Sequence, residues 1–91
     1  MSSLYARTFT VGTATAVQIV EPNPNGQHVY IHDHTKNASR DLFVGGPDVS
    51  VTNGFHILAT ESQDFVVPPG ESMWAIATGG DISVQVLVSR V

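Results

Sequence analysis

The chain has 91 residues, no cysteine and a formal charge of −4, from eight acidic and four basic residues. This length suits one domain, the missing thiols exclude disulfides and cysteine-bound zinc, and the acidic balance excludes the basic surface that nucleic-acid binding needs. Only 13% of the residues are charged, about half of the usual share, so we expect a partner to cover part of the surface.

The apolar composition favours strands over helices. Thirteen Val, five Ile and eight Thr stand against four Leu, and β-branched side chains fit a pleated sheet better than a helix. No run of apolar residues has the length of a membrane span, and the first residues lack the pattern of a secretory signal. We predict an all-β single domain over residues 1–91, a β-sandwich or jelly-roll-like barrel of about eight short antiparallel strands with no significant helix.

Period-two alternation of apolar and polar residues predicts the strands in chain order. Their approximate ranges are 4–11, 14–20, 27–33, 41–45, 48–52, 55–58, 63–67, 72–77 and 82–90. Residues 1–5 are expected either to extend as a flexible arm that pairs with a neighbouring sheet edge or to fray. The Asn-Gly pairs at 25–26 and 53–54 tolerate positive φ at both positions. The turn residues expected to determine the fold are Gly26, Gly45, Gly46, Asp48, Asn53, Gly54 and Gly70.

The same alternation assigns side chains to faces. Within 82–90 it places one set of residues in the core, namely Ile82, Val84, Val86 and Val88. Within 27–33, Val29 and Ile31 point one way and Tyr30 points the other. Trp74 shares a side with Ile76, and we predict a core position for it, with an interface anchor as the alternative. Leu87 lies on the polar side of its strand, either as an ordinary exposed leucine or as part of a contact surface.

Three histidines have the same parity and are the candidate metal ligands, although we predict no metal. His28, His32 and His34 would share one face of a strand, and imidazole nitrogens bind divalent metals. The spacing of Gly26, His32 and His34 follows the pattern Gly-x5-His-x-His, which resembles the opening of the first cupin motif. The glutamate of that motif is missing, and Pro68-Pro69-Gly70 is not followed by the histidine of the second cupin motif. The alternative is that His28 and His32 line a solvated or interfacial sheet face and that His34 begins a turn.

Catalytic patterns are absent from the sequence. No Gly-x-Ser-x-Gly turn holds a serine nucleophile, and there is no cysteine. The carboxylates of Glu61, Asp64 and Glu71 lie near predicted turns, where such groups are usually solvated. No glycine loop leads into a helix to bind phosphate. We therefore expect neither enzymatic activity nor a cofactor.

The order of motifs over residues 27–91 resembles small β-sandwich virion proteins of tailed bacteriophages. The matching segments are Val29–His32, a Val44-Gly45-Gly46-Pro47-Asp48-Val49 corner, an Asn53-Gly54-Phe55 turn, Gly70-Glu71-Ser72-Met73-Trp74-Ala75-Ile76-Ala77 and the closing Ile82–Val88. The resemblance implies a non-enzymatic capsid decoration or minor capsid protein. Such a protein docks on the capsid surface, reinforces contacts between capsomers and self-associates, commonly as a trimer.

The resemblance also sets the expected partners and leaves alternatives. The expected partners are the major capsid protein and further copies of this chain, without nucleic acid or membrane, on a virion assembled in the host cytoplasm. The candidate interface residues are Leu4, Tyr5, Tyr30, Trp74 and Leu87. One alternative is a tail or head-fibre module that binds a host-surface glycan through Tyr30, which lies between His28 and His32. Another is a cupin-like metalloprotein that uses the three histidines.

Overall fold

Eight strands make up the ordered framework of this computed structural model, which describes residues 4–36 and 39–90. They are β1 (Leu4–Val11), β2 (Val17–Val20), β3 (Gln27–Asp33), β4 (Asp41–Gly45), β5 (Phe55–Ile57), β6 (Ser62–Val67), β7 (Met73–Thr78) and β8 (Ile82–Arg90). Within the described ranges, no helix has the length and apolar character needed to cross a membrane.

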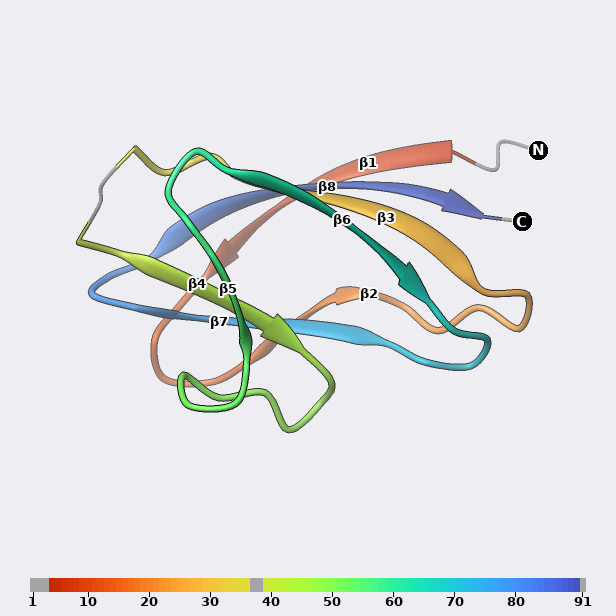
Figure 1. The fold of residues 1–91 in the computed structure, drawn as a ribbon, viewed down its shortest axis with the longest axis horizontal. Coiled ribbons are helices and arrows are strands. Elements are labelled where there is room, and N and C mark those ends of the chain that lie inside the picture. Colours follow the sequence, from red (N-terminus) through yellow and green to blue (C-terminus); the bar gives the residue numbers. More distant parts are fainter. Residues whose placement is uncertain (1–3, 37–38, 91) are drawn as a thin grey trace.

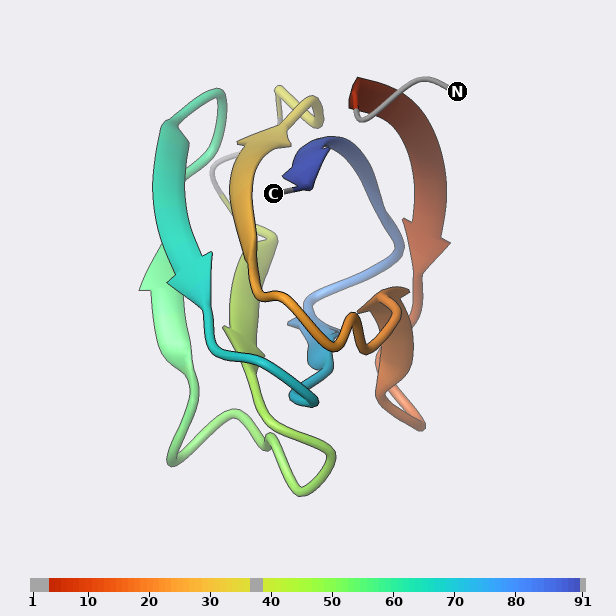
Figure 2. The same cartoon turned by 90° about the vertical axis from the view of Figure 1, so that its right-hand side faces the viewer.

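The strands form two four-stranded sheets that face each other (Figures 1 and 2). The first sheet has the order β1-β8-β3-β6 and the second has the order β2-β7-β4-β5. All pairings are antiparallel. Successive strands alternate between the sheets until β4, and this winding gives the jelly-roll form of the β-sandwich. The predicted all-β fold with about eight antiparallel strands is confirmed.

The core lies between the sheets and consists mainly of β-branched and small residues. The four residues predicted for the core face of the last strand are buried, and so are Val29 and Ile31 of β3. The second sheet contributes Leu42 and Ile57 together with Ala75 and Ala77 of its central strand β7. Full burial of side chains of the Val and Ile class stabilises a fold by about 1.5–3 kcal/mol each, so this layer holds the two sheets together.

The segment predicted as a strand over 48–52 forms turns instead. The Ser50 backbone N–H donates to Asn53 Oδ1 at 2.7 Å, and the Gly54 N–H donates to the Ser50 carbonyl at 2.9 Å. These local bonds give the backbone partners that a sheet would otherwise supply. Alternating Val49 and Val51 therefore did not indicate a strand. The second strand is also shorter than predicted, since it begins at Val17 rather than near residue 14.

The two Asn-Gly pairs differ from expectation in their backbone angles. Gly26 has a φ of 79°, but Asn25, Asn53 and Gly54 do not have positive φ. Gly54 is constrained by space, because a Cβ there would lie 2.7 Å from the Phe43 Cβ. The glycine requirement at this position is therefore steric rather than conformational.

The expected N-terminal arm is only partly within the described structure. Leu4 and Tyr5 belong to β1, where they pair with Ser89 and Val88 of β8. They are therefore sheet residues rather than an arm, and residues 1–3 lie outside the described ranges. β1 is an edge strand of the first sheet and pairs with β8.

Candidate functional site

The outer face of the first sheet is the first candidate site, and we call it the tyrosine face. Inward residues of its two central strands, β3 and β8, are mostly buried, so the alternate residues project outward. Directly opposed partners place these outward residues in cross-strand rows. The tyrosine face consists of Leu4, Ala6, Thr8, Thr10, His28, Tyr30, His32, Ser62, Asp64, Val66, Ser83, Gln85, Leu87 and Ser89.

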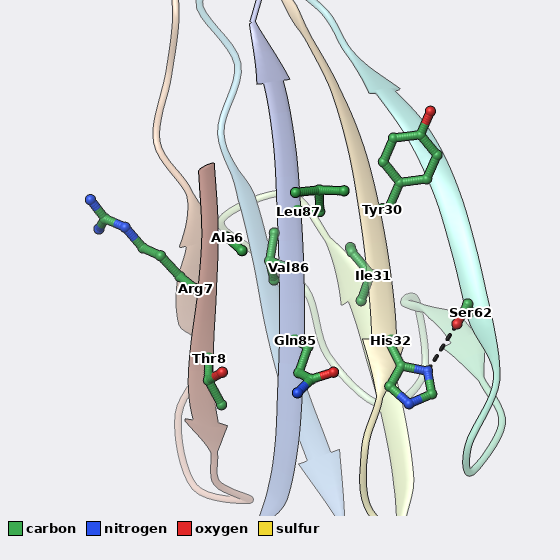
Figure 3. Close-up of a pocket in the computed structure, with 10 residues that line it drawn as sticks. All are labelled: Ala6, Arg7, Thr8, Tyr30, Ile31, His32, Ser62, Gln85, Val86 and Leu87. Carbon is green, nitrogen blue, oxygen red and sulfur yellow. Dashed lines mark hydrogen bonds between the residues drawn. The ribbon is translucent and has the colours of Figure 1, made fainter. Parts of the chain in front are cut away.

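Two adjacent rows of the tyrosine face form an open groove of about 490 Å³. One row runs Ala6, Leu87, Tyr30 and Asp64, and the next runs Thr8, Gln85, His32 and Ser62. Figure 3 shows Leu87 and Tyr30 side by side above the row that contains Gln85 and His32. The volume lies in the range of about 300–1,000 Å³ typical of ligand pockets.

Tyr30 is held in place on this face by a neighbouring histidine. Its side chain is 44% exposed, and its ring stacks on His28 with centroids 4.7 Å apart and an interplanar angle of 21°. His28 Nε2 in turn lies 2.8 Å from Asp64 Oδ2. The Tyr30 ring is therefore exposed, and its stacking on His28 fixes its orientation.

Two of the three candidate metal ligands, His28 and His32, lie on the tyrosine face, whereas His34 follows the end of β3 at Asp33. Tyr30 separates His28 from His32, and His32 Nδ1 lies 2.8 Å from Ser62 Oγ. The rings of His32 and His34 are tilted, with centroids 5.6 Å apart. Within residues 4–36 and 39–90, no three His, Cys, Asp or Glu side chains are grouped so that they could hold a metal ion.

The tyrosine face combines apolar exposure with little formal charge. Its exposed large hydrophobic residues are Leu4, Tyr30, Leu87 and Val66, the last of which is 75% exposed. Asp64 is its one Asp, Glu, Lys or Arg residue, and it is bonded to His28. Exposed apolar side chains with so little charge beside them make this face a candidate interaction surface.

The outer face of the second sheet is the second candidate site, and we call it the tryptophan face. The core prediction for Trp74 is wrong, because the inward positions of β7 are Ala75 and Ala77. Trp74 does share a side with Ile76, as predicted, but that side faces outward and both are half-buried. Its Nε1 donates to Ser72 Oγ at 2.9 Å. The tryptophan face consists of Gln18, Asp41, Phe43, Gly45, His56, Trp74, Ile76 and Thr78.

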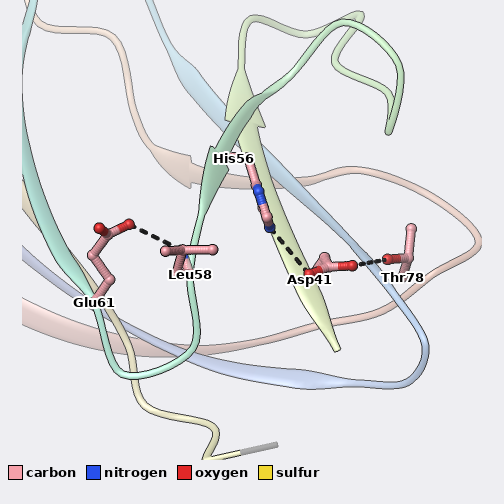
Figure 4. A network of polar contacts seen from close by, with 5 residues as sticks. All are labelled: Asp41, His56, Leu58, Glu61 and Thr78. Carbon is pink, nitrogen blue, oxygen red and sulfur yellow. Dashed lines mark hydrogen bonds and ion pairs between the residues drawn. The ribbon is translucent and has the colours of Figure 1, made fainter. Parts of the chain in front are cut away.

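A polar network crosses the tryptophan face at the β4 and β5 strands (Figure 4). His56 Nε2 lies 3.0 Å from Asp41 Oδ1, and the Thr78 hydroxyl donates to Asp41 Oδ2 at 3.4 Å. The His56 ring also stacks on Phe43, with centroids 4.9 Å apart. Both ionisable side chains remain about 40% exposed.

Three further hydrophobic residues form the rim of the second sheet beside β5. They are Val51, Phe55 and Leu58, each more than 40% exposed. Phe55 contacts Phe65 edge to face, with centroids 5.4 Å apart. We call these three residues the β5 rim.

Tyr5 differs from the other candidate interface residues. It is half-buried and packs against the core, and its hydroxyl accepts a hydrogen bond from Arg90 Nη2 at 3.0 Å. The guanidinium groups of Arg90 and Arg7 lie 4.8 and 5.2 Å from its ring centroid. Leu4, Tyr30 and Leu87 lie on the tyrosine face, and Trp74 lies on the tryptophan face.

One buried ionisable group was missed by the sequence reasoning. Asp33 is fully buried at the end of β3. Burial raises its pKa above the usual range, although a hydrogen bond from Thr35 and the nearby His32 oppose that rise. The signal was present, since the alternation that turns Val29 and Ile31 inward turns Asp33 inward as well. Its carboxylate accepts a hydrogen bond from the Thr35 backbone N–H just after the end of β3.

No protein family matches the sequence. No curated protein matches it either. Among solved structures, RmlC from Streptococcus suis in complex with dTDP-D-xylose has a TM-score of 0.57 at 12% identity, covering 98% of this chain and 45% of that chain. This chain therefore spans less than half of the RmlC chain.

Two further structures have a similar fold. A protein of Bacillus endospore appendages, which form disulfide-linked pili, has a TM-score of 0.51 at 11% identity over 98% of this chain and 89% of its own. BH2720 from Bacillus halodurans has a TM-score of 0.53 at 11% identity over 97% of this chain and 63% of its own. At these identities the similarities establish the fold, and function must come from the site.

Proposed function

We propose that this protein is a non-enzymatic structural component of a tailed-bacteriophage virion, a decoration or minor capsid protein that docks on the capsid surface. The motif order over residues 27–91 supports the proposal, because it resembles proteins of that kind. The jelly-roll form is compatible with it, since capsid domains are among the proteins built on this fold. Because this fold also serves other functions, the argument for docking must come from the residues on the surface.

The observation that carries the proposal is the position of Trp74. The single tryptophan of the chain lies on the outer side of its sheet beside Ile76, while small alanines occupy the core side. Tryptophan is strongly enriched among the residues that dominate binding energy at protein interfaces. The bond from Nε1 to Ser72 fixes the indole, which lowers the entropy lost on docking.

The surroundings of Trp74 suit a docking surface. Phe43 and Ile76 add half-buried apolar side chains to the tryptophan face, and the β5 rim adds exposed hydrophobic residues at the edge of the same sheet. Asp41 is the one formally charged residue of this face, and His56 and Thr78 already contact its carboxylate. Little charge would have to be desolvated when the face is covered.

Docking through this face would reinforce a shell by mass action. A protein that binds the assembled lattice and not its separate subunits stabilises the assembly. Several linked copies raise the effective affinity of each weak contact. We therefore propose a homo-oligomer, a trimer in the resemblance, that bridges neighbouring copies of the major capsid protein.

Cosedimentation tests the proposal. The purified protein is mixed with assembled shells, or with unassembled major capsid protein, from the phage that encodes it. We expect it to sediment with shells, and we expect Trp74→Ala to weaken binding by about tenfold or more, as for an interface hot spot. Leu87→Ala, on the opposite sheet, is the matched control and should bind normally. Absence of binding to shells, or loss of binding only in Leu87→Ala, would overturn the proposal.

A further inference from the structure

The groove on the tyrosine face has two rows of different chemistry. Ala6, Leu87 and Tyr30 form an apolar row, whereas the adjacent row presents the hydrogen-bonding groups of Thr8, Gln85, His32 and Ser62. The rows are two residues apart along the strands, roughly 7 Å; the polar row crosses four strands, roughly 14 Å, and the apolar row crosses three, roughly 10 Å. The groove therefore suits an elongated ligand with one apolar side and one hydroxyl-rich or amide-rich edge.

The most exposed ring in the groove is prearranged. Tyr30 stacks on His28, whose Nε2 is bonded to Asp64. His32 is similarly oriented, because its Nδ1 is engaged by Ser62 Oγ and its Nε2 is the nitrogen that can meet a ligand. Groups that are already ordered lose little conformational entropy when a ligand binds.

The charges at the groove favour a neutral ligand. Asp64 is the one formally charged member of the tyrosine face and contacts His28. Arg7 lines the groove, but its side chain extends away from the β1 edge, and its guanidinium lies 5.2 Å from the Tyr5 ring (Figure 3). Phosphate or sulfate groups are bound by clustered cations and bidentate arginines, and the described groove offers no such cluster.

A sugar ring has the complementary chemistry. The C–H face of a pyranose packs on an aromatic ring, and its hydroxyl groups both donate and accept hydrogen bonds. The amide of Gln85 and the hydroxyl of Thr8 can do the same. A purely apolar protein partner would instead leave this polar row without partners, which is costly once it is buried.

We infer that the tyrosine-face groove binds a neutral oligosaccharide, with one pyranose ring stacked on Tyr30 and its hydroxyl groups bonded to Gln85 and His32. This inference goes beyond the proposed docking function and does not depend on it. Docking through the tryptophan face would leave the tyrosine face directed away from the shell, where a glycan could reach it.

Two-dimensional ¹H–¹⁵N NMR tests the inference on the full chain. Cellotriose, maltotriose, mannotriose and N-acetylchitotriose are each titrated to concentrations on the order of 10 mM, which detects dissociation constants in the millimolar range. We expect at least one of them to shift the amides of Tyr30, Gln85, His32 and Leu87, while amides of the tryptophan face stay unchanged. The absence of localised shifts with all four sugars would overturn the inference.

Variants of two exposed residues separate stacking from nonspecific effects. Tyr30→Ala should weaken binding about tenfold, because aromatic stacking and apolar contact are both lost, whereas Tyr30→Phe should retain binding. Val66→Ala is the matched control, since Val66 is exposed on the same face but does not line the groove. The spectrum of each variant also reports whether it is folded.

Two results would contradict a saccharide site. One is unchanged sugar binding in folded Tyr30→Ala. The other is a set of tyrosine-face shifts that depends on protein concentration and not on sugar, because this would show that a second copy of the chain covers the face. A failure of shell binding in the cosedimentation experiment would leave the saccharide result unaffected, so the two proposals can fail separately.

Discussion

The backbone N–H of Thr35 donates a hydrogen bond of 2.9 Å to Oδ1 of the buried Asp33 carboxyl group. The other carboxyl oxygen, Oδ2, is also buried and has no hydrogen-bond partner among the described residues. The Asp33 backbone N–H donates to the Glu61 carbonyl, and Thr35 Oγ1 accepts from the Ser83 N–H. Asp33 and Thr35 thus join the end of β3 to the start of β8 and to the loop before β6.

The burial of the Asp33 carboxyl group makes the free energy of unfolding depend on pH. Because burial raises the pKa of Asp33, the folded state holds this proton more tightly than the unfolded chain. The contribution of Asp33 to the free energy of unfolding is therefore greatest below the unfolded pKa of about 3.9 and is lost as the pH rises through the raised folded value. Denaturant unfolding of Asp33→Asn across that range should show its stability rising relative to the original protein as the pH increases.

Exposed Asp48 supplies the control for this measurement. Asp48→Asn removes one exposed carboxylate and so controls for the loss of a negative charge alone. A constant difference between Asp33→Asn and the original protein at every pH would contradict the assignment of the proton to Asp33.

A second prediction concerns the glycine beside Phe43. A methyl group at Gly54 would lie 2.7 Å from the Phe43 Cβ and 2.9 Å from the Ser50 carbonyl oxygen, so residues 50–54 would have to move. We expect Gly54→Ala to lower the free energy of unfolding by about 1–3 kcal/mol, as overpacking does. Gly12→Ala is the control, because its Cβ would lie 3.6 Å from the closest atom, Asp81 Oδ1. Equal denaturant midpoints for the two variants would refute the steric argument.

The last strand shows why much of the fold was predictable. Ile82, Val84, Val86 and Val88 alternate with polar residues and Leu87, so the period of two identifies both strand and core face. The central strand of the other sheet gives no such signal, because Trp74, Ala75 and Ile76 are all apolar. The space between the sheets decides which side of β7 faces inward. Small alanine side chains fit there, and an indole is too large. That information lies in residues of other strands.

The candidate sites were predictable to different extents. Tyr30 and its neighbours were found because His28 and His32 alternate with buried Val29 and Ile31. The rows of the groove were not, since they depend on the pairing of β1 with β8 and of β8 with β3, between residues that lie far apart in sequence. The turn at Ser50 was missed because side-chain bonds from Asn53 compete with strand pairing.

The outward position of Trp74 can be checked by fluorescence. In the folded protein, acrylamide should quench Trp74 emission, and bound shells should protect it if the tryptophan face docks. Trp74→Ala should also destabilise the fold less than Leu42→Ala, because Leu42 is fully buried and such a truncation costs about 2–5 kcal/mol. Full resistance to acrylamide, or a larger loss of stability in Trp74→Ala than in Leu42→Ala, would show that the indole is part of the core.

Native mass spectrometry reads the oligomeric state and any bound metal together. We expect a metal-free trimer, because the proposed function needs several copies, and because His28, His32 and His34 do not converge within the described structure. Dilution should dissociate the trimer if contacts between copies are weak without the shell, and addition of shells should then restore assembly. A monomer that also fails to associate on shells would contradict the oligomeric part of the proposal. One tightly held metal per chain would contradict the proposed role as a metal-free structural protein. The His28→Ala, His32→Ala and His34→Ala variants would then show which imidazoles hold the ion.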